Sequence, residues 1–373
     1  MNYLSTRGEA PALGFEEVLL AGLARDGGLY VPEAWPALPA LGTLRGLPYA
    51  ALADRILSPF VAGAIQPAQF VRMLEEAAAA FQSPAVTPLS QIDERTFLLE
   101  LFHGPTLAFK DVAMQLLGRM FEAVLARTGS RLTIIGATSG DTGSAAMEAL
   151  RGRAGMDVFI LHPLGRVSEV QRRQMTTMTE ENVHALAIEG TFDDCQAIVK
   201  ALFGDLAFRD RVNLSGVNSI NWARIMPQIV YYVAAALALG VPGRRIAFSV
   251  PTGNFGDIYA GYAARCMGLP VERLVIATNV NDILARTLET GRYEMRGVTP
   301  TLSPSMDIQV SSNFERLLFD AYGRDPAPVR LAMDELRRKG AFAVAPDARR
   351  TLEAGFAAGR TDEEATLATI ARV

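Results

Sequence analysis

Hydrophobic and polar positions change their period several times along the chain. Residues 15–82 carry apolar side chains at helical spacing, most clearly at 15–28 and 68–81. From residue 96 onwards, short apolar runs alternate with amphipathic stretches of helical period. Short apolar runs predict strands, and apolar positions three or four residues apart predict helices. The pattern therefore predicts a mainly helical N-terminal region followed by alternating strands and helices.

Strands and helices are expected to alternate through the middle of the chain. The predicted strands are residues 96–102, 131–137, 156–161, 183–188, 245–250 and 273–278. The predicted helices are residues 112–129, 142–152, 167–175, 193–206, 223–240 and 256–268. This order is typical of an α/β fold with mostly parallel sheets covered by helices. About the last hundred residues are predicted to be helical without a clear sheet strand, and residues 340–346 are ambiguous.

Composition narrows the class of protein. The chain has 373 residues and is 50% hydrophobic, which suits a large core and two or three domains or subdomains. A net charge of −4 with 20% charged residues makes a nucleic-acid surface unexpected. The longest apolar stretch, residues 229–241, is too short to span a bilayer, and the N-terminus lacks the pattern of a secretory signal.

The cysteines and histidines carry no recognisable site. Cys195 and Cys266 form no CxxC pair and no disulfide framework, so a reducing, cytoplasmic setting is expected. The histidines have no metal-ligand spacing, and no metal is expected. They are His103, His162 and His184.

One basic residue stands out at the start of a predicted helix. Nearly all of the 36 basic residues are arginine, and the lysines are Lys110, Lys200 and Lys339. Lys110 follows the apolar residues 107–109, and Asp111 beside it is expected to cap the helix. Burial and the positive end of the helix dipole should lower the pKa of Lys110, which favours a neutral amine that can react with an aldehyde. A buried ion pair is the alternative interpretation.

Two glycine-rich segments follow predicted strands and begin predicted helices. The first is ATSGDTG (residues 137–143), and the second is PTGNFGD (residues 251–257). Free N–H groups at a helix start bind anions, and glycines let the backbone approach them closely. An ordinary helix cap is the alternative for each segment. Neither segment matches GxGxxG or GxxxxGK[ST], which disfavours dinucleotides and P-loop nucleotides.

Together these features predict a cofactor that needs a lysine and carries one phosphate. Ligands bind at the carboxyl ends of parallel strands, where both segments are expected. Pyridoxal 5'-phosphate has the required chemistry. Lys110 would hold its aldehyde, and one of the two segments would hold its phosphate.

The motifs resemble those of the threonine synthase family, which are pyridoxal-phosphate enzymes of the tryptophan-synthase-β type (fold type II). They are YLSTRG, ARDGGLYVPE, LELFHGPTLAFKD, ATSGDTGSAA, VNSIN, PTGNFGD, ATNVND and SPSMDIQVSSNFERLLF. The resemblance covers essentially the whole chain. It implies a mainly helical N-terminal domain at residues 1–95 and a catalytic α/β region at 96–373. A smaller subdomain at roughly 130–215 would carry the substrate segment.

The resemblance also implies roles for individual residues. Lys110 would form the Schiff base with the cofactor. The segment around the cofactor would be Gly253, Asn254, Phe255, Gly256 and Asp257. The substrate carboxylate would meet Ser139, Gly140, Asp141, Thr142 and Gly143, and Asn218, Ser219 and Asn221 would lie near the pocket. The implied reaction converts O-phospho-L-homoserine and water to L-threonine and phosphate by a monomer or homodimer.

Family members continue beyond the point that Val373 matches. The part without a counterpart here would include stretches like DPHTAVG and TAHPAKF, and the second supplies a hydroxyl that faces the pyridine nitrogen. The chain is therefore expected to bind the cofactor better than it turns over substrate.

Two other functions stay open at this point. A serine or threonine dehydratase would use the same cofactor and the same segment for the substrate carboxylate, but it would not depend on a substrate phosphate. A non-catalytic member would bind pyridoxal phosphate without turnover. The YLSTRG and DGGLYVPE stretches favour threonine synthase.

Overall fold

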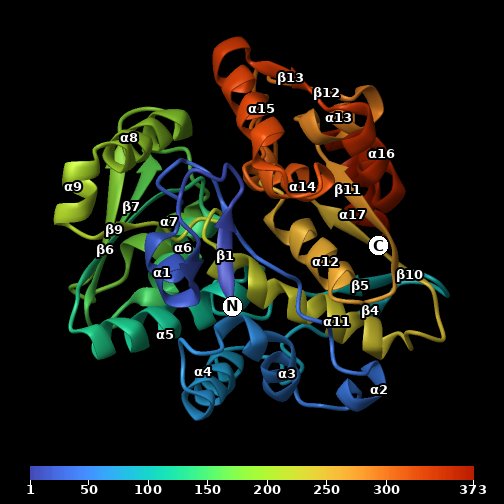
Figure 1. The fold of residues 1–373 in the computed structure, drawn as a ribbon, viewed down its shortest axis with the longest axis horizontal. Coiled ribbons are helices and arrows are strands. Elements are labelled where there is room, and N and C mark those ends of the chain that lie inside the picture. The colour runs from blue at the N-terminus through green and yellow to red at the C-terminus, as the bar shows by residue number, and fades with distance from the viewer.

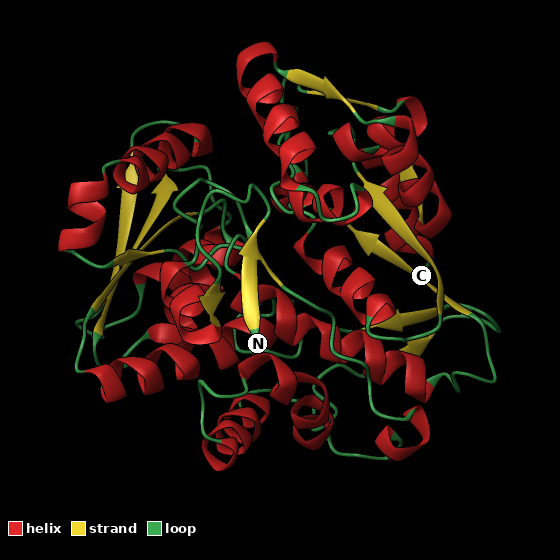
Figure 2. Ribbon diagram, in the orientation of Figure 1, coloured by secondary structure: helices red, strands yellow, loops and turns green.

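Two parallel sheets, each flanked by helices, lie on opposite sides of the molecule (Figures 1 and 2). The computed structural model describes residues 1–373, except for the side chain of Asp193. The predicted α/β class with mostly parallel, helix-covered sheets is confirmed by this architecture. Among the described residues, every helix is too short or too polar to span a membrane.

The N-terminal region combines a small sheet with four helices. Strands β1 (Asn2–Ser5), β2 (Leu13–Gly14) and β3 (Tyr30–Pro32) form an antiparallel sheet in the order β2-β1-β3. The helices are α1 (Phe15–Ala21), α2 (Leu41–Leu44), α3 (Tyr49–Val61) and α4 (Pro67–Ala79). The prediction of a mainly helical region missed this sheet because its strands have at most four residues, too few to establish a period.

Helix α1 is shorter than its apolar pattern predicted. It ends at Gly22, which has a φ of 66°. The loop that follows is held by the carboxylate of Asp26, which accepts bonds from the N–H groups of Ala10 and Gly28, both at 2.8 Å. The helix therefore ends before residue 28 for two reasons. A glycine lies at its C-terminus, and the side chain of Asp26 holds the following loop in a non-helical conformation.

The first parallel sheet has four strands in the order β8-β7-β6-β9. They are β6 (Leu132–Ala137), β7 (Met156–Pro163), β8 (Val183–Ile188) and β9 (Leu214–Ser215). The helices between them are α6 (Asp141–Leu150), α7 (Glu169–Thr176), α8 (Phe192–Gly204) and α9 (Leu206–Arg211). Strands β6 and β7 are mostly buried, which accounts for their continuous apolar sequences.

The second parallel sheet has three strands in the order β10-β11-β14. They are β10 (Ile246–Pro251), β11 (Val271–Thr278) and β14 (Phe356–Arg360), and α12 (Gly256–Cys266) connects the first two. The prediction that the C-terminal part has no sheet strand is wrong. The strand sequence FAAGR has weak strand propensity, and pairing with β11 along its whole length overrides it.

Among the other C-terminal elements, helices α13 and α16 pack against this second sheet, and the rest lie beyond or beside it (Figure 1). The helices are α13 (Ile283–Thr290), α14 (Phe314–Ala321), α15 (Pro326–Lys339), α16 (Pro346–Gly355) and α17 (Glu363–Arg372). Strands β12 (Arg292–Glu294) and β13 (Ala341–Ala343) pair antiparallel, so the ambiguous residues 340–346 contain a strand. A 3-10 turn at Pro304–Met306 lies in the long connection before α14.

Two further predicted elements differ from the structure. The helix predicted at 223–240 is divided into α10 (Trp222–Ile225), a 3-10 turn (Met226–Gln228) and α11 (Ile229–Ala238). The division falls at Pro227, which has no N–H to continue the helical bonding. The strand predicted at 96–102 is reduced to β5 (Phe97–Leu99), which pairs antiparallel with β4 (Leu89–Gln91) outside both parallel sheets.

Helix α5 (Asp111–Thr128) links the N-terminal helices to the first sheet. It packs against α4, α6 and α10, and apolar residues along it, such as Met114, Leu117 and Phe121, are completely buried. It ends at Gly129, as predicted, in a left-handed conformation with a φ of 67°. Burial on several sides fixes this helix, and therefore also the residue at its start.

Candidate active site

Lys110 lies at the junction between a tight loop and α5, where it is the N-cap residue. The prediction that Asp111 caps the helix is wrong. Its carboxylate instead accepts bonds from the N–H and the hydroxyl of Thr106, both at 2.8 Å. A Cβ at Gly104 would lie 2.5 Å from Oδ2 of Asp111. The loop is therefore folded closely over Asp111, and this fixes the direction in which the chain enters α5.

The amine of Lys110 lies in a mostly buried position beside an acid. Its side chain is 11% exposed, and Nζ lies 3.0 Å from Oδ2 of Asp141. Nζ also lies 4.6 Å from the centre of the Phe109 ring. Burial lowers the pKa of Lys110, and the Asp141 carboxylate offsets only part of this effect. The predicted low pKa and the alternative interpretation, a buried ion pair, are thus both found at this residue.

The first glycine-rich segment joins β6 to α6. The hydroxyl of Thr138 accepts bonds from the N–H groups of Gly140 and Gly143, both at 2.9 Å. Two of the donors at the start of α6 are therefore already satisfied within the segment. Ser139 and Thr142 are half-buried beside them.

The carboxylate of Asp141 is the polar centre of this segment. It accepts bonds from Lys110, from the amide of Gln171 and from the hydroxyl of Ser305. Burial raises the pKa of Asp141, but Lys110 and Ser305 lower it by more, so the net shift is downward. Gly140 has a φ of 143°, and a side chain there would collide with Gln171. The segment thus holds a negative charge against the amine.

The second glycine-rich segment joins β10 to α12. Phe255 is the N-cap residue, with a left-handed φ of 65° and no side-chain cap. The N–H groups of residues 253–257 donate to no oxygen among the described residues. A Cβ at Gly253 would lie 2.6 Å from the carbonyl oxygen of Ser305, and one at Gly256 would lie 3.1 Å from Cβ of Ser219. Both glycines are therefore needed for close packing, and the segment presents unpaired donors.

The polar side chains of this second segment point elsewhere. The carboxylate of Asp257 accepts bonds from the hydroxyls of Tyr231, at 2.5 Å, and Tyr232, at 2.8 Å, both on α11. Burial raises the pKa of Asp257, and these hydroxyls lower it in part. Asn254 is exposed, and its carbonyl accepts bonds from the N–H and the amide of Asn313. The segment therefore offers its backbone to a ligand and uses the Asp257 side chain as an anchor.

Residues 217–221 form a third loop beside these segments. Oδ1 of Asn218 is buried without a partner among the described residues and would lie 3.4 Å from a Cβ at Gly136. The hydroxyl of Ser219 accepts a bond from the amide of Asn313 at 2.9 Å. Asn221 is different, because its amide caps α10 and donates to the carbonyl of Leu19 at 2.9 Å. Asn221 is thus engaged within the fold, whereas Asn218 keeps an open acceptor.

Residues 303–319 connect the three loops, and sequence reasoning gave none of them a role. Besides the contact of Ser305 with the first segment, the hydroxyl of Ser311 donates to the carbonyl of Gly253 at 2.7 Å. Asn313 bonds to the second segment and to the third loop. The available signal was the stretch SPSMDIQVSSNF, which is rich in serine and asparagine and resembles the threonine synthase family.

An open pocket of about 380 Å3 lies next to the pair of Lys110 and Asp141. Its lining includes Phe109, Asp141 and Gln171, and the last of these lies on α7. Leu107 is at its rim, with a left-handed φ of 64° and a side chain that is 56% exposed. This pocket gives a small polar molecule a route towards the amine.

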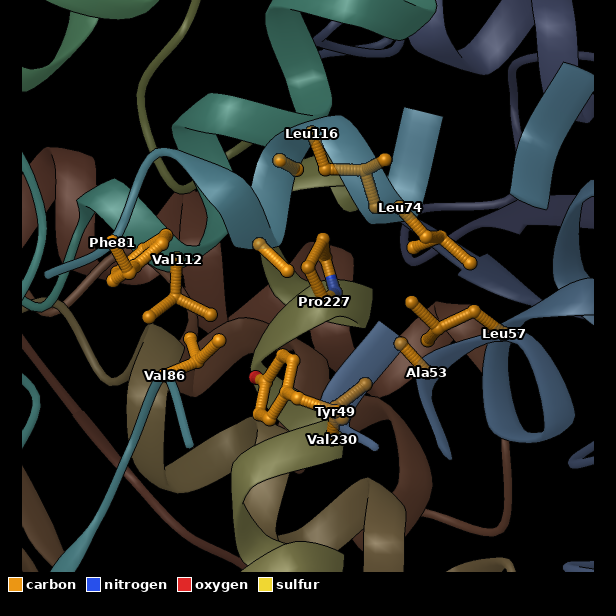
Figure 3. Close-up of a pocket in the computed structure, with 12 residues that line it drawn as sticks. Tyr49, Ala53, Leu57, Leu74, Phe81, Val86, Val112, Leu116, Pro227 and Val230 are labelled. Atoms are coloured by element: carbon orange, nitrogen blue, oxygen red, sulfur yellow. The ribbon is translucent and has the colours of Figure 1, made fainter. Parts of the chain in front are cut away.

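A smaller cavity of about 20 Å3 lies between α3, α4, α5 and α11 (Figure 3). Its lining is mainly apolar and includes Leu57, Leu116 and Pro227, with the Tyr49 ring among them. The Tyr49 hydroxyl is buried and has no partner among the described residues. The volume suits about one water molecule. The lining has no charged group, so this cavity lacks the chemistry of an active site.

Two family descriptions together match almost the entire chain. "Threonine synthase N terminus" matches residues 2–78, and "Pyridoxal-phosphate dependent enzyme" matches residues 78–371. With its helix-covered parallel sheets and its buried lysine beside the first glycine-rich segment, the chain is a pyridoxal-phosphate-dependent enzyme of fold type II.

Relatives define the family within this class. The threonine synthase of Pseudomonas aeruginosa is 57% identical over 375 residues, which span 100% of this chain and 80% of the relative. The structure of threonine synthase from Brucella melitensis with bound pyridoxal phosphate has 62% identity and a TM-score of 0.94, over 97% of this chain and 78% of that one. The yeast threonine synthase structure has 44% identity and a TM-score of 0.91, over 97% of this chain and 77% of the yeast chain. The chain belongs to the threonine synthase family of pyridoxal-phosphate-dependent lyases.

The groups present at the site fit this cofactor. Lys110 has the amine that an aldehyde needs, with a pKa lowered by burial. The start of α12 has unpaired N–H groups and two closely packed glycines, which suit a phosphate. The unpaired Oδ1 of Asn218 suits a donor on a bound molecule.

Proposed function

We propose that the chain converts O-phospho-L-homoserine and water into L-threonine and phosphate, with Lys110 as its catalytic residue. The observation that carries this proposal is the position of the Lys110 amine, which is mostly buried and lies beside Asp141. The threonine synthases to which the chain is similar support the choice of substrate. They favour this function over the dehydratase and non-catalytic alternatives.

Lys110 would move protons at the substrate. Bound pyridoxal phosphate supplies an aldehyde for covalent attachment and an electron sink for negative charge at the substrate Cα. Because burial lowers its pKa, the amine of Lys110 has a larger neutral fraction at neutral pH and can accept a proton from Cα or Cβ. It later returns a proton, while phosphate leaves from Cγ and water adds at Cβ.

We assign the cofactor phosphate to the backbone N–H groups of residues 253–257. The unpaired donors and the positive end of the α12 dipole support this assignment. Asp257 would act indirectly, because its carboxylate is bonded to Tyr231 and Tyr232 and so anchors the start of α12.

We assign the substrate carboxylate to residues 139–143. The donors would be the N–H groups of Asp141 and Thr142 and the hydroxyls of Ser139 and Thr142, because Thr138 accepts the bonds of the Gly140 and Gly143 N–H groups. The Asp141 carboxylate would repel a second carboxylate, so its role is to hold the Lys110 amine. Asn218 and Ser219 would line the same site.

We also propose the larger organisation of the protein. The N-terminal domain would end near residue 95, and the subdomain at roughly 130–215 is supported by the first parallel sheet, which begins at Leu132 and ends at Ser215. A cytoplasmic location is supported by the free thiols of Cys195 and Cys266. The active form would be a monomer or a homodimer.

The proposed function is tested by the products formed from O-phospho-L-homoserine in the presence of pyridoxal phosphate. Phosphate and L-threonine should appear in equal amounts, and Lys110→Ala should lower the rate of formation of both by roughly a thousandfold. A keto acid from serine or threonine, without phosphate-dependent turnover, would favour the dehydratase. Cofactor binding without any product would favour the non-catalytic alternative.

A further inference from the structure

One buried guanidinium joins three of the motifs that resemble the threonine synthase family. Arg316, on α14, is completely buried. Its Nε donates to the carbonyl of Tyr30 at 3.0 Å, and its Nη1 and Nη2 donate to the carbonyls of Ser219, at 3.1 Å, and Ile220, at 2.6 Å. Its Nη1 also donates to Oδ1 of Asn313. Strand β3, the third loop and the start of α14 are therefore fixed to one another.

The side-chain amide of Asn313 has only one possible orientation in this network. A guanidinium has donors but no acceptor, so the atom of Asn313 that faces Arg316 must be the oxygen. A carbonyl has acceptors but no donor, so the atom that faces the carbonyl of Asn254, at 2.9 Å, must be the nitrogen. Asn313 is buried, and solvent offers it no other partner. Two independent neighbours thus require the same orientation.

This orientation decides how the hydroxyl of Ser219 is used. The amide nitrogen of Asn313 lies 2.9 Å from Oγ of Ser219. Because that nitrogen can only donate, Oγ must accept this bond, and the hydrogen of the hydroxyl is left for a different acceptor. The hydroxyl donates to no oxygen among the described residues. Ser219 therefore has a hydrogen-bond donor that the fold itself does not use.

The Ser219 hydroxyl lies at the proposed active site. A Cβ at Gly256 would lie 3.1 Å from Cβ of Ser219 and 3.5 Å from Nδ2 of Asn313. Both side chains thus lie against the start of α12, where the N–H groups are unpaired. Ser219 is half-buried, and the neighbouring Asn218 has the unpaired acceptor Oδ1. The third loop therefore has an unused donor and an unused acceptor for a bound molecule.

We propose that Asn313 is a positioning residue that makes the Ser219 hydroxyl a hydrogen-bond donor to the bound ligand. This inference rests on the proposed function, in which Ser219 lines the substrate site. Arg316 and the carbonyl of Asn254 orient Asn313, and Asn313 in turn orients the hydroxyl. A donor that is held in this way needs no reorientation when an anionic oxygen of a ligand binds. The roles of Asn313 and Arg316 are indirect, and no covalent step is involved.

Asn313→Asp tests the proposal because it changes the chemistry of the side chain and almost preserves its shape. A carboxylate can only accept, so it keeps the bond from Arg316 and draws the hydrogen of the Ser219 hydroxyl away from the ligand. At saturating pyridoxal phosphate, kcat/KM for O-phospho-L-homoserine should fall by about tenfold to a hundredfold. The dissociation constant for pyridoxal phosphate is measured in parallel on the cofactor-free protein.

The new negative charge also repels an anionic ligand, and Ser219→Ala separates this effect from that of the hydroxyl. Asn313→Asp adds the same charge in the Ser219→Ala background, where no hydroxyl is present. If Asn313 acts through Ser219, Asn313→Asp should lower kcat/KM at least about fivefold less in that background than in the wild type. The same coupling in the dissociation constant for pyridoxal phosphate would identify the cofactor as the ligand of the hydroxyl. Equal losses in the two backgrounds, in both measurements, would overturn the proposal.

Asn313→Ala applies the same comparison without a new charge, and it decides the question if Asn313→Asp does not fold. The hydroxyl is then free to rotate, so the loss should be about twofold to fivefold and should disappear in the Ser219→Ala background.

Asn182→Asp is the matched control, because it makes the same substitution at the amino end of β8, away from the candidate site. The amide of Asn182 donates to the carbonyl of Leu150 at 3.0 Å, and its Oδ1 accepts a bond from the N–H of Gly152 at 2.8 Å. The control should lower Tm and leave both ligand measurements unchanged.

Failure of the proposed function gives a different result. If the wild type forms no product from O-phospho-L-homoserine, the substrate assignment is wrong, and the dissociation constant for pyridoxal phosphate alone decides the role of Asn313. A loss that depends on the Ser219 hydroxyl then supports the proposal, and equal losses in the two backgrounds overturn it.

Discussion

The two glycine-rich segments have similar sequences but offer a ligand different groups. In the first, Thr138 already accepts two N–H groups of its own segment, and the carboxylate of Asp141 is bonded to Lys110. In the second, the N–H groups at the start of α12 have no partner among the described residues, and the carboxylate of Asp257 is bonded to tyrosines of α11. The first segment presents an anion at the site, and the second presents uncharged donors.

The difference comes from where each acid lies in its helix. Asp141 is the first residue of α6, and Asp257 is the second residue of α12. A shift of one residue rotates a side chain by about 100° around the helix axis. One acid therefore faces Lys110 and the other faces α11. The pattern of glycine and aspartate identifies an anion-binding helix start, but one residue decides whether the acid itself faces the ligand.

The largest effect is expected at the Lys110 amine, which contacts Asp141 of the first segment. Lys110→Ala should fold, because it removes one mostly buried side chain and leaves Asp111 and its bonds to Thr106 in place. Turnover should fall by roughly a thousandfold, because a base at the substrate is lost. Borohydride treatment of the wild type with pyridoxal phosphate should label one peptide, which mass spectrometry should identify as the one containing Lys110.

Lys200 provides the control for this prediction. It is exposed on α8, and Lys200→Ala should leave turnover and labelling unchanged. A label on Lys200 or on Lys339 would show that the central assignment is wrong.

Gly256→Val should weaken the second segment as a phosphate site. A Cβ at this position would lie 3.1 Å from Cβ of Ser219 and 3.2 Å from Cδ1 of Ile225, so the start of α12 must move away from the third loop. Overpacking of this kind should raise the dissociation constant for pyridoxal phosphate by roughly tenfold to a hundredfold. Gly204→Val, where a Cβ would meet nothing within 4 Å, is the control. If the dissociation constant for pyridoxal phosphate is unchanged in Gly256→Val, the cofactor phosphate must be assigned to the first segment instead.

Thr142→Val should affect the substrate more than the cofactor. The hydroxyl of Thr142 is half-buried in the first segment and is proposed to donate to the substrate carboxylate. Because valine has nearly the same shape, the variant should keep the cofactor affinity of the wild type. KM for O-phospho-L-homoserine should rise by about fivefold to tenfold. If Thr142→Val instead weakens the affinity for pyridoxal phosphate and leaves KM unchanged, the first segment binds the cofactor phosphate and the second segment binds the substrate carboxylate.

The sequence predicted those parts of the fold that are encoded locally. Strands β6 and β7 are mostly buried runs of apolar residues, β10 and β11 contain shorter apolar runs, and the helices between them have a clear period. The strand β14 was missed because its sequence is weak and its partner β11 lies some 80 residues earlier in the chain. The helix predicted at 223–240 was too long because an apolar period does not show the effect of Pro227 on backbone bonding.

In the candidate site, too, local sequence patterns were predictable and long-range contacts were not. Lys110 and the two glycine-rich segments could be found from sequence, because a lysine after an apolar run and glycines before a helix are local patterns. Ser305 and Asn313 could not, because their roles depend on contacts with Asp141 and Ser219, at least 94 residues away.

The smallest effect is expected from Asp141→Asn, which tests whether the anion of the first segment controls the amine. Burial lowers the pKa of Lys110, and the Asp141 carboxylate raises it. Asparagine removes the charge, so the pKa of Lys110 should fall further, and the neutral amine should persist to lower pH. The rate at which the cofactor-free protein attaches pyridoxal phosphate is followed by absorbance as a function of pH. The pH profile of this rate should keep its shape and shift to lower pH.

The stability of the Asp141→Asn variant provides a second test with a defined sign. Burial raises the pKa of Asp141, but Lys110 and Ser305 lower it by more, so in the folded protein it lies below its ordinary value of 3.8. A lowered carboxylate pKa contributes stability that is fully present above the ordinary pKa and is lost as pH falls through the folded-state pKa. The difference in Tm between the wild type and Asp141→Asn should thus be largest at neutral pH and shrink at acid pH. Asp157→Asn, which breaks the largely exposed pair with Arg131, should change neither measurement appreciably. If the attachment profile of Asp141→Asn stays in place or moves to higher pH, Asp141 does not keep the amine protonated, and the two segments differ less than their geometry indicates.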